Sequence, residues 1–389
     1  MRVPLRRRFV IKSKMKFITQ IVGIIRLRSW WNHIVPPVLG AVYFVVLLSN
    51  STVLQSWSFV ALWFVSIIGT AVFGFALNDL FDASEDAMAG KSNYLAKTTK
   101  PVIGLILVSS FCLAVIPLFF IDISSATMLL FTIQLTCLVV YSTPPFRLKK
   151  NIYVSIVLDS LYSGLLFILA IVFSDFPASN PLVFRSILLP LLIAMLFARG
   201  LRNILLHQIY DEAFDRKSNT PSMALHLGAE KVQYLIRVFI LPFELVLGMS
   251  LIGLLSFSIA GIGLLIPVYL LYLALKYFEH KRRSAQIKQT VYLQWHNDFY
   301  EDLLPLFFLI MLSINDPWYL IVTGIHVVIF SNKIVFLTLK NLWYMVYGTV
   351  YRKAMLWLYY HPVKWLYYKA FCNKYVKNFR NIIIRNHGQ

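Results

Sequence analysis

Apolar runs long enough to cross a lipid bilayer recur along almost the whole chain, and they constrain its fold more than any other feature. A helix at 1.5 Å per residue needs about 20 apolar residues to cross a hydrocarbon core. Apolar residues make up 59% of the 389 residues and charged residues only 14%, whereas soluble domains carry roughly 25% charged residues. The sequence therefore predicts an all-α integral membrane protein. The eight clearest runs lie near 31–50, 56–77, 101–121, 124–141, 152–173, 183–206, 232–256 and 258–278.

The distribution of basic residues predicts how these spans are oriented. Lys and Arg mark the cytoplasmic loops of multi-pass proteins, and residues 1–28 contain nine of them and no acid. The formal net charge of +20 therefore indicates a membrane surface, and we expect no nucleic acid partner because no recognition module is present. Alternating the spans from a cytoplasmic N-terminus places the other basic loops on the same side, at 78–100, 142–151, 207–231 and 276–302.

The last part of the chain is less regular. An apolar stretch at 303–338 is interrupted by Asn315-Asp316-Pro317, so it forms either one span or a hairpin broken at Pro317. Residues 339–389 are basic and aromatic, and a helical pattern after Pro362 favours a helix on anionic headgroups over a disordered tail. We therefore expect a basic N-terminal segment 1–28, a transmembrane domain 29–338 and an interfacial tail 339–389.

Acidic residues are rare in this chain and gather at two points. At the end of the second span, Asn78, Asp82 and Asp86 repeat every four residues, so they line one face of a helix. At the end of the sixth span, Asp211 and Asp215 repeat this spacing. A solvated helix end explains one acidic turn, but not two with the same period at the same depth. Three residues continue the face of the second cluster back into the membrane: Arg199, Asn203 and His207.

Two facing rows of carboxylates predict a bound cation. Stacked carboxylates repel each other unless a cation lies between them. Oxygen ligands suit hard ions, and Mg²⁺ usually takes one or two protein carboxylates together with water and substrate phosphates. The pattern therefore predicts Mg²⁺ that holds a diphosphate.

A basic loop after the fourth span fits the same chemistry. This span ends in Tyr141-Ser142-Thr143-Pro144-Pro145-Phe146-Arg147-Leu148-Lys149-Lys150. The Pro pair ends the helix and stiffens the loop. Hydroxyl groups beside Arg147 and Lys149 supply donors for phosphoryl oxygens, whereas Lys150 is typical of an ordinary cytoplasmic loop.

These three motifs carry a resemblance to a known family. The segments from Asn78 to Asp86, from Asp211 to Asp215, and Tyr141-Ser142 with Arg147-Leu148-Lys149 resemble the two Asp-rich motifs and the basic loop of the UbiA-type intramembrane prenyltransferase superfamily. The motifs keep the family's order and spacing over roughly residues 25–280. The resemblance implies a bundle of about nine transmembrane helices around a central cavity, capped by cytoplasmic loops.

The resemblance also implies roles for individual residues. The Mg²⁺ ligands would be Asn78, Asp82, Asp86, Asp211 and Asp215. The positive or hydroxyl partners of an isoprenyl diphosphate would be Lys91, Tyr141, Ser142, Arg147 and Lys149. Asn78 and Asp79 are also expected to bind substrate, and Tyr141 and the four Asp residues of the metal site are assigned to catalysis. Arg28 and Asn32 resemble polar residues of the family's first helix, and Asn32 is expected to bind substrate.

The second motif departs from the family pattern. The family usually has Gly four residues after the last Asp, where this chain has Asn219. Asn tolerates a left-handed backbone better than most residues, so we expect the turn to be kept. In the loop after the first motif, Tyr94 stands where many relatives have Pro. These departures leave the acceptor open.

Other polar residues inside the spans allow more than one interpretation. Arg199 and Arg202 could bind a diphosphate or an anionic acceptor, or could neutralise the Asp clusters. His207 could act as a base on the acceptor or form a hydrogen bond to a carboxylate. Asp159 and Glu244 lie within spans, where ionisable groups are functional by default, and Glu244 could instead pair with Arg237.

The chemistry that these parts predict is Mg²⁺-assisted prenyl transfer. An allylic carbon–oxygen bond ionises when the leaving diphosphate is stabilised by Mg²⁺ and fixed cations, and a lipid-buried cavity would protect the allylic cation from water. The alternatives are a terpene cyclase, which needs no acceptor, and a transporter or lipid-binding protein that binds a cation without chemistry. We expect a multi-pass protein of a bacterial plasma (inner) membrane whose active site opens toward the cytoplasm.

Overall fold

The structure is a computed structural model that describes residues 21–174, 184–282, 289–331, 335 and 339–340. The chain divides into two compact units, 1–334 and 335–389, and the elements below belong to the first. The expected interfacial helix after Pro362 lies outside the described residues.

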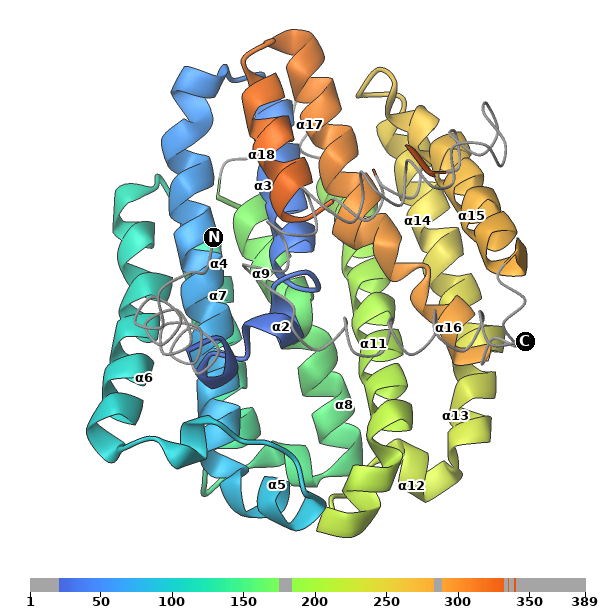
Figure 1. The fold of residues 1–389 in the computed structure, drawn as a ribbon. Helices are drawn as coiled ribbons and strands as arrows, with labels where there is room; N and C mark the ends of the chain where they lie inside the picture. Colours follow the sequence, from blue (N-terminus) through green and yellow to red (C-terminus); the bar gives the residue numbers. More distant parts are fainter. Residues whose placement is uncertain (1–20, 175–183, 283–288, 332–334, 336–338, 341–389) are drawn as a thin grey trace, which may run out of the picture. The chain divides into compact units, whose positions relative to one another are not determined.

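All regular structure in the described residues is helical, as the sequence predicts (Figure 1). The first helices are α2 (Leu27–Trp30), α3 (Val35–Ser49), α4 (Val53–Phe81), α5 (Ala83–Ala89), α6 (Lys100–Val115), α7 (Ser125–Ser142), α8 (Ile152–Ser160) and α9 (Leu166–Val172). They are followed by α11 (Leu189–Ser218), α12 (Met223–Leu227), α13 (Ala229–Leu235), α14 (Leu241–Leu255), α15 (Leu265–Arg282), α16 (Gln289–Gln294), α17 (Leu304–Asn315) and α18 (Tyr319–Ile329). The short helices used below are η1 (Leu95–Lys97), η3 (Leu148–Lys150), η4 (Leu161–Leu165) and η8 (Phe299–Leu303).

The described helices have the length and composition of a multi-pass membrane protein. Six are long and apolar enough to cross a bilayer: Val53–Phe81, Lys100–Phe120, Ser125–Ser142, Ile152–Val172, Ser186–Ser218 and Ala229–Leu255. Three shorter apolar helices accompany them: Val35–Ser49, Ile262–Phe278 and Tyr319–Ile329. Apolar side chains such as Leu105, Leu129 and Val246 are more than 60% exposed. Lipid is the solvent that accommodates such a surface.

The apolar stretch 303–338 is broken, as one of the two interpretations of the sequence requires. Helix α17 ends at Asn315 and α18 begins at Tyr319, because Pro317 cannot continue the first helix. The two helices pack against each other, and Figure 1 shows them at the end of the unit opposite to α5 and α12. Asp316 stabilises the turn, since its Oδ2 accepts a hydrogen bond of 2.9 Å from the backbone of Val53.

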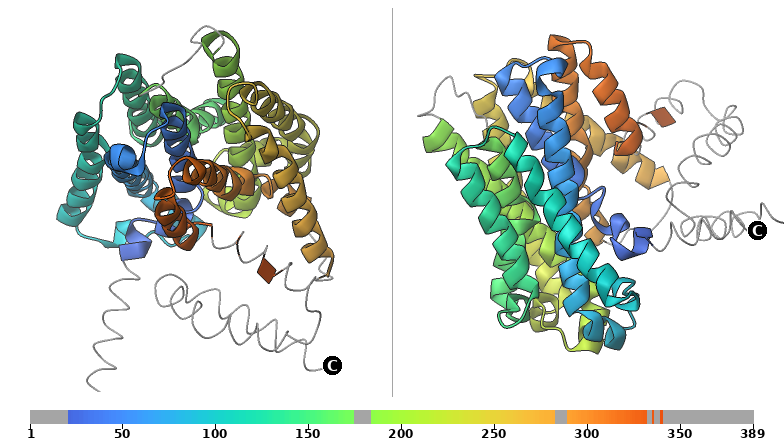
Figure 2. Two further views of the ribbon diagram at one scale, coloured as in Figure 1. Left: turned by 90° about the horizontal axis from the view of Figure 1, so that it is seen from above. Right: turned by 90° about the vertical axis from the view of Figure 1, so that its left-hand side faces the viewer.

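Glycine residues allow two close helix contacts. An ideal Cβ at Gly69 in α4 would lie 2.3 Å from the backbone nitrogen of Ala114 in α6, and one at Gly200 in α11 would lie 2.6 Å from the carbonyl oxygen of Ser160 in α8. Figure 2 shows α4, α6 and α7 side by side on one flank. The Gly200 contact sets the register between α8 and α11, which carry buried polar groups discussed below.

The fifth span contains a helical irregularity at its centre. The π-helical turn η4 joins α8 to α9, and Gly164 within it has non-helical φ and ψ of 161° and −30°. Gln134 Nε2 from α7 donates a hydrogen bond of 2.8 Å to the carbonyl oxygen of Tyr162. Such turns occur frequently at functional sites.

Candidate active site

The two acidic clusters lie at the same end of the helical unit. Helix α5 follows α4, α12 follows α11, and Figure 1 shows both short helices at the lower end. Helix α5 also packs against α11. A direct ion pair joins the clusters, because Lys91 Nζ, just after α5, lies 2.6 Å from Asp211 Oδ2 in α11. The structure therefore brings together two motifs that are more than 120 residues apart in sequence.

The first cluster does not lie on one uninterrupted helix. Helix α4 ends at Phe81, and Asp82 is the residue between α4 and α5, with φ and ψ of −97° and 2°. The four-residue spacing is nevertheless kept by backbone hydrogen bonds, from Asp82 N to the Asn78 oxygen (2.9 Å) and from Asp86 N to the Asp82 oxygen (2.8 Å).

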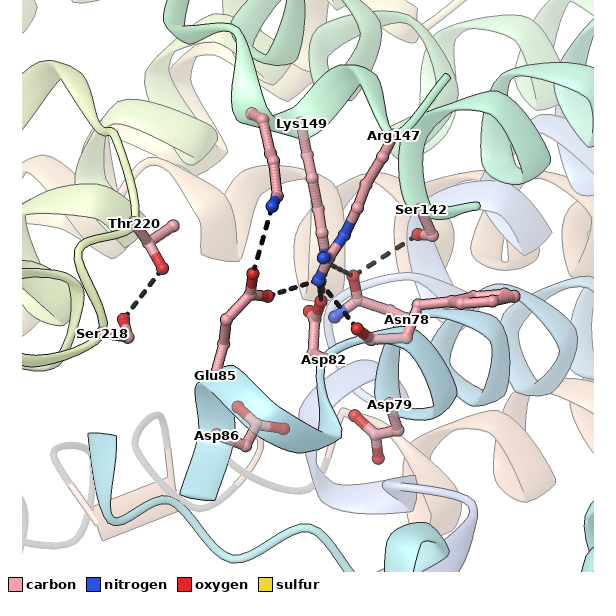
Figure 3. A network of polar contacts seen from close by, with 12 residues as sticks. Asn78, Asp79, Asp82, Glu85, Asp86, Ser142, Arg147, Lys149, Ser218 and Thr220 are labelled. Carbon is pink, nitrogen blue, oxygen red and sulfur yellow. Dashed lines mark hydrogen bonds and ion pairs between the residues drawn. The ribbon is translucent and has the colours of Figure 1, made fainter. Parts of the chain in front are cut away.

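The loop after α7 supplies cations to the first cluster (Figure 3). Helix α7 ends at Ser142, before the two prolines, as expected. Arg147 has a left-handed backbone with φ of 37°, a conformation that costs a non-glycine residue about 1–2 kcal/mol. Its Nη2 lies 3.0 Å from Asp82 Oδ1 and also contacts Glu85. Lys149 contacts Asp82 as well, so one carboxylate meets two cations.

Lys149 is held in a mostly buried position. Burial lowers the pKa of its ammonium group, and the adjacent Asp82 carboxylate opposes this shift. Its Nζ also donates a hydrogen bond of 3.0 Å to Asn78 Oδ1. Ser142 Oγ lies 3.4 Å from the same Asn78 oxygen. Lys149, Ser142 and Asn78 thus belong to one polar network with Asp82.

Tyr141 lies near the end of α7 and contacts the fifth span. Its ring packs edge-on against Tyr162, with centroids 5.1 Å apart. Tyr162 in turn donates a hydrogen bond of 2.6 Å to Asp159 Oδ2.

The second cluster keeps its turn without the family's glycine. Helix α11 ends at Ser218, and Asn219 has a left-handed backbone with φ of 52°, which confirms the expectation from the sequence. His207 Nδ1 lies 3.7 Å from Asp211 Oδ2. Glu212 pairs instead with Arg216 at 2.8 Å on an exposed part of the helix. The carboxylates at 211 and 212 therefore have different surroundings although they are adjacent.

Three residues of the site had no clear signal in the sequence. Arg26 Nη1 lies 2.8 Å from Asp79 Oδ1, whereas the sequence pointed to Arg28, which is exposed. Glu85 pairs with Arg147. Asn93 donates hydrogen bonds to the Asp79 carbonyl oxygen (2.7 Å) and to Asp86 Oδ2 (3.0 Å), so it fixes the loop after α5.

Of the remaining expected residues, Arg202 has a partner away from both clusters. It is fully buried, and its Nε and Nη2 donate to the two oxygens of Glu244 at 2.6 and 3.1 Å. Glu244 thus pairs with Arg202 rather than with Arg237. Asn32 is half-buried and forms no side-chain hydrogen bond within the described part of the chain.

The donor set fits a hard divalent cation. Within the described residues, no group of three or more His, Cys, Asp or Glu side chains is arranged closely enough to hold a metal ion by itself. Mg²⁺ does not need such a cage, because it usually takes one or two carboxylates and completes its coordination with water and phosphate oxygens. The carboxylate and amide oxygens of the two clusters supply suitable ligands.

Comparisons with known proteins identify the family. The fold and the site together define a class of protein, namely a membrane-spanning helical bundle with acidic and basic side chains gathered at one end. The family model described as the UbiA prenyltransferase family matches residues 35–297. The chain belongs to this family and is an intramembrane prenyltransferase.

The fold is similar to that of solved UbiA homologues from Archaeoglobus fulgidus. One bound to DMAPP and Mg²⁺ is 16% identical, with a TM-score of 0.53 over 75% of this chain and 99% of that chain. One bound to GPP and Mg²⁺ is 15% identical, with a TM-score of 0.51 over 76% and 99%. A search of curated proteins found no match.

Proposed function

We propose that this prenyltransferase uses Mg²⁺ to transfer an isoprenyl group from an isoprenyl diphosphate to a lipophilic or aromatic acceptor, with release of diphosphate. The observation that carries the proposal is the meeting of two acidic clusters with basic side chains between them. Lys91 pairs with Asp211 at 2.6 Å, and Lys149 and Arg147 pair with Asp82. Such a mixture of charges suits a ligand that is itself a cation bound to a polyanion.

The proposed metal ligands are the side-chain oxygens of Asn78, Asp82, Asp86, Asp211 and Asp215. When bound there, Mg²⁺ would offset the negative charge that develops on the leaving diphosphate. Solved UbiA homologues bound to Mg²⁺ together with DMAPP or GPP support the choice of the ion.

The cations of the site would bind the diphosphate directly. Arg147 presents a guanidinium fork that matches phosphoryl oxygens, and Lys91 and Lys149 present ammonium groups. Each is now paired with a carboxylate, so diphosphate binding exchanges one set of ion pairs for another. Tyr141 and Ser142, at the end of α7, would contribute hydroxyl donors.

The reaction itself is a substitution at the allylic carbon. The bond from this carbon to the diphosphate oxygen breaks, and the diphosphate leaves with the electron pair. A new bond forms from the acceptor to the same carbon, and the acceptor loses a proton. The protein would position the two reactants and exclude water from the cation-like transition state.

Two adjacent acids in α11 allow a matched test of this proposal. We expect purified protein with Mg²⁺, labelled isoprenyl diphosphates of several lengths and a total lipid extract to give a prenylated product. Asp82→Asn and Asp211→Asn should lower its formation at least 100-fold, because each removes a proposed metal ligand. Glu212→Gln should remain close to wild type, since Glu212 pairs with the exposed Arg216.

The same assay separates the alternative functions. Product from the diphosphate alone would indicate a terpene cyclase, and an absolute need for the extract would exclude one. Absence of diphosphate release under every condition would refute catalysis and favour a cation-binding transporter. Equal activity in Asp211→Asn and Glu212→Gln would refute the metal assignment.

The orientation and location of the protein belong to the same proposal. The basic loops that carry Lys91, Arg147 and Lys149 lie at the end of the unit that holds both acidic clusters, and basic loops face the cytoplasm. We therefore place the active site at the cytoplasmic side of a bacterial plasma membrane. Protease accessibility of the loop after α7 in sealed vesicles, or thiol labelling of a cysteine introduced into this loop, tests this orientation.

A further inference from the structure

Glu85 in α5 is paired with two basic side chains of the loop after α7 (Figure 3). Its Oε2 contacts Arg147 Nη2, and its Oε1 lies 3.7 Å from Lys150 Nζ. Glu85 is not a proposed metal ligand, because it falls outside the four-residue spacing that joins Asp82 and Asp86. Both of its carboxylate oxygens thus face cations of one loop.

Arg147 has other acceptors that hold it in place. Its Nη2 donates hydrogen bonds to the carbonyl oxygen of Phe81 (2.7 Å) and to Asp82 Oδ1 (3.0 Å), in addition to its contact with Glu85. The first two acceptors remain when Glu85 is replaced. The Nε of Arg147 is buried and has no hydrogen-bond partner among the described residues. Glu85 is therefore an additional acceptor and not the group that positions the guanidinium.

The contact between Glu85 and Arg147 is open to exchange with a ligand. Their side chains are 22% and 17% exposed, and that of Lys150 is 60% exposed. The arginines of α11 are different, because Arg199 is only 5% exposed and Arg202 is fully buried. The ion pairs of the loop can therefore rearrange near solvent, whereas those within α11 cannot.

The Glu85 carboxylate occupies Arg147 as a phosphoryl group would. A carboxylate and a phosphoryl group each present two oxygens that match the donors of a guanidinium. Because Asp82 is a proposed metal ligand, Glu85 is the carboxylate on Arg147 that has no metal to bind. Three acceptors already share Nη2 of Arg147. A diphosphate that binds this nitrogen must therefore compete with Glu85.

Lys150 supplies a second partner for the displaced carboxylate. It is the last residue of η3, in the same loop as Arg147. The 3.7 Å between its Nζ and Glu85 Oε1 is longer than a hydrogen bond, so the two groups can still approach each other. A carboxylate that leaves Arg147 can pair with this ammonium group, and its charge is then not left without a partner.

We propose that Glu85 limits the affinity of the site for diphosphate by competing for Arg147. Binding of the isoprenyl diphosphate displaces the carboxylate toward Lys150. After the reaction, Glu85 returns to Arg147 and so favours departure of the diphosphate product. This inference rests on the proposed prenyl transfer and assigns to Glu85 and Lys150 a role in the affinity and release of its diphosphate.

Binding of pyrophosphate in the presence of Mg²⁺, measured by calorimetry on the purified full chain, tests the competition. Glu85→Gln should lower the Kd about tenfold, because the competing negative charge is lost while the other acceptors of Arg147 remain. Solvent screening keeps the effect below that of a fully buried ion pair. Glu212→Gln is the matched control, since it neutralises a carboxylate that pairs with Arg216 at 2.8 Å. Its Kd should stay within a factor of about two of the wild-type value.

The sign of the change separates competition from a structural role. Loss of a residue that only fixed the loop could weaken the binding of pyrophosphate but would not tighten it. An unchanged or higher Kd in Glu85→Gln would therefore overturn the proposal. An equal decrease in Glu85→Gln and Glu212→Gln would also overturn it, because net charge alone would then explain the effect.

A double-mutant cycle tests the part assigned to Lys150. Lys150→Met should raise the Kd about threefold in the wild-type background, because the displaced carboxylate loses its second partner. In the Glu85→Gln background the same substitution should have a much smaller effect, since no carboxylate then needs a partner. An equal effect in both backgrounds would show that Lys150 attracts the diphosphate itself and would overturn this part of the proposal.

Steady-state kinetics extend the test to the reaction. Glu85→Gln should lower the KM for the labelled isoprenyl diphosphate and should make added pyrophosphate a stronger inhibitor by a similar factor. A higher KM with unchanged inhibition would contradict the competition. If the wild type binds no pyrophosphate with Mg²⁺, the proposed function itself fails. If the wild type binds it and Glu85→Gln binds it no more tightly, only the present inference fails.

Discussion

Replacing Arg202 by Met should destabilise the protein strongly although the two side chains have similar lengths. Arg202 and Glu244 are both fully buried, and two hydrogen bonds of 2.6 and 3.1 Å join them. Met fills much of the same space, so the lost packing is small. The main cost is the Glu244 carboxylate that remains without its cation. His296 Nε2 still lies 3.2 Å from this carboxylate.

The size of this effect follows from the least costly way to remove that charge. Glu244 can take up a proton, which costs about 1.4 kcal/mol for each pH unit between the reference pKa of about 4.3 and the working pH. At pH 7 this amounts to roughly 3.7 kcal/mol, within the range of about 3–5 kcal/mol for breaking a buried ion pair. The penalty should decrease to about 1 kcal/mol near pH 5, because the proton is then more easily acquired.

A double-mutant cycle measures this directly. Arg202→Met, Glu244→Gln and the combined variant should be compared by reversible unfolding in mixed micelles at pH 7 and pH 5. We expect the double variant to recover most of the loss of Arg202→Met, because neither charge then remains. A penalty below about 1 kcal/mol for Arg202→Met at pH 7, or strict additivity in the cycle, would refute the reasoning.

Three further predictions concern the site and the packing around it. Lys91→Met should strengthen the binding of Mn²⁺ alone, monitored by paramagnetic resonance, because Asp211 loses its ion-pair partner. The same substitution should weaken pyrophosphate binding, measured by calorimetry, because an ammonium group is lost. Unchanged affinities would contradict the exchange of ion pairs. Gly69→Val should lower the unfolding temperature, since even a Cβ lies 2.3 Å from the Ala114 backbone nitrogen, and wild-type stability would show that the helices can separate without cost. Asn219→Gly should be neutral or stabilising and Asn219→Val destabilising by about 1–2 kcal/mol, and the opposite order in thermal unfolding would argue against the left-handed turn.

The break in the stretch 303–338 shows what a local sequence pattern can predict and what it cannot. The sequence allowed either one span or a hairpin, because Pro317 ends a helix but does not determine where the chain goes next. The structure has a break, and the turn is held by a hydrogen bond from Val53 to Asp316. This partner is 263 residues away, so no local pattern could have revealed it.

In the proposed site, too, some features could be predicted from the sequence and others could not. The four-residue spacing of the acids and the loop with Arg147 and Lys149 could be anticipated from residue types alone. The left-handed turn at Asn219 was expected from the resemblance to the family, which usually has Gly there. The pairing of Arg26 with Asp79 could not, because several basic residues near the N-terminus are equivalent in sequence. The pairing of Arg202, rather than Arg199, with Glu244 was equally hidden, since both are arginines on one helix three residues apart.

The sequence by itself determined that lipid surrounds most of this protein, that its fold is helical, and which chemical groups its site contains. Long apolar runs can satisfy their backbone hydrogen bonds in lipid only as helices, and clustered acids beside clustered bases predict a metal-bound polyanion. Only the tertiary structure decided which charges meet and which remain without a partner. A buried charge is neutralised by groups within a few ångströms, and such distances between helices are set by packing rather than by spacing along the chain.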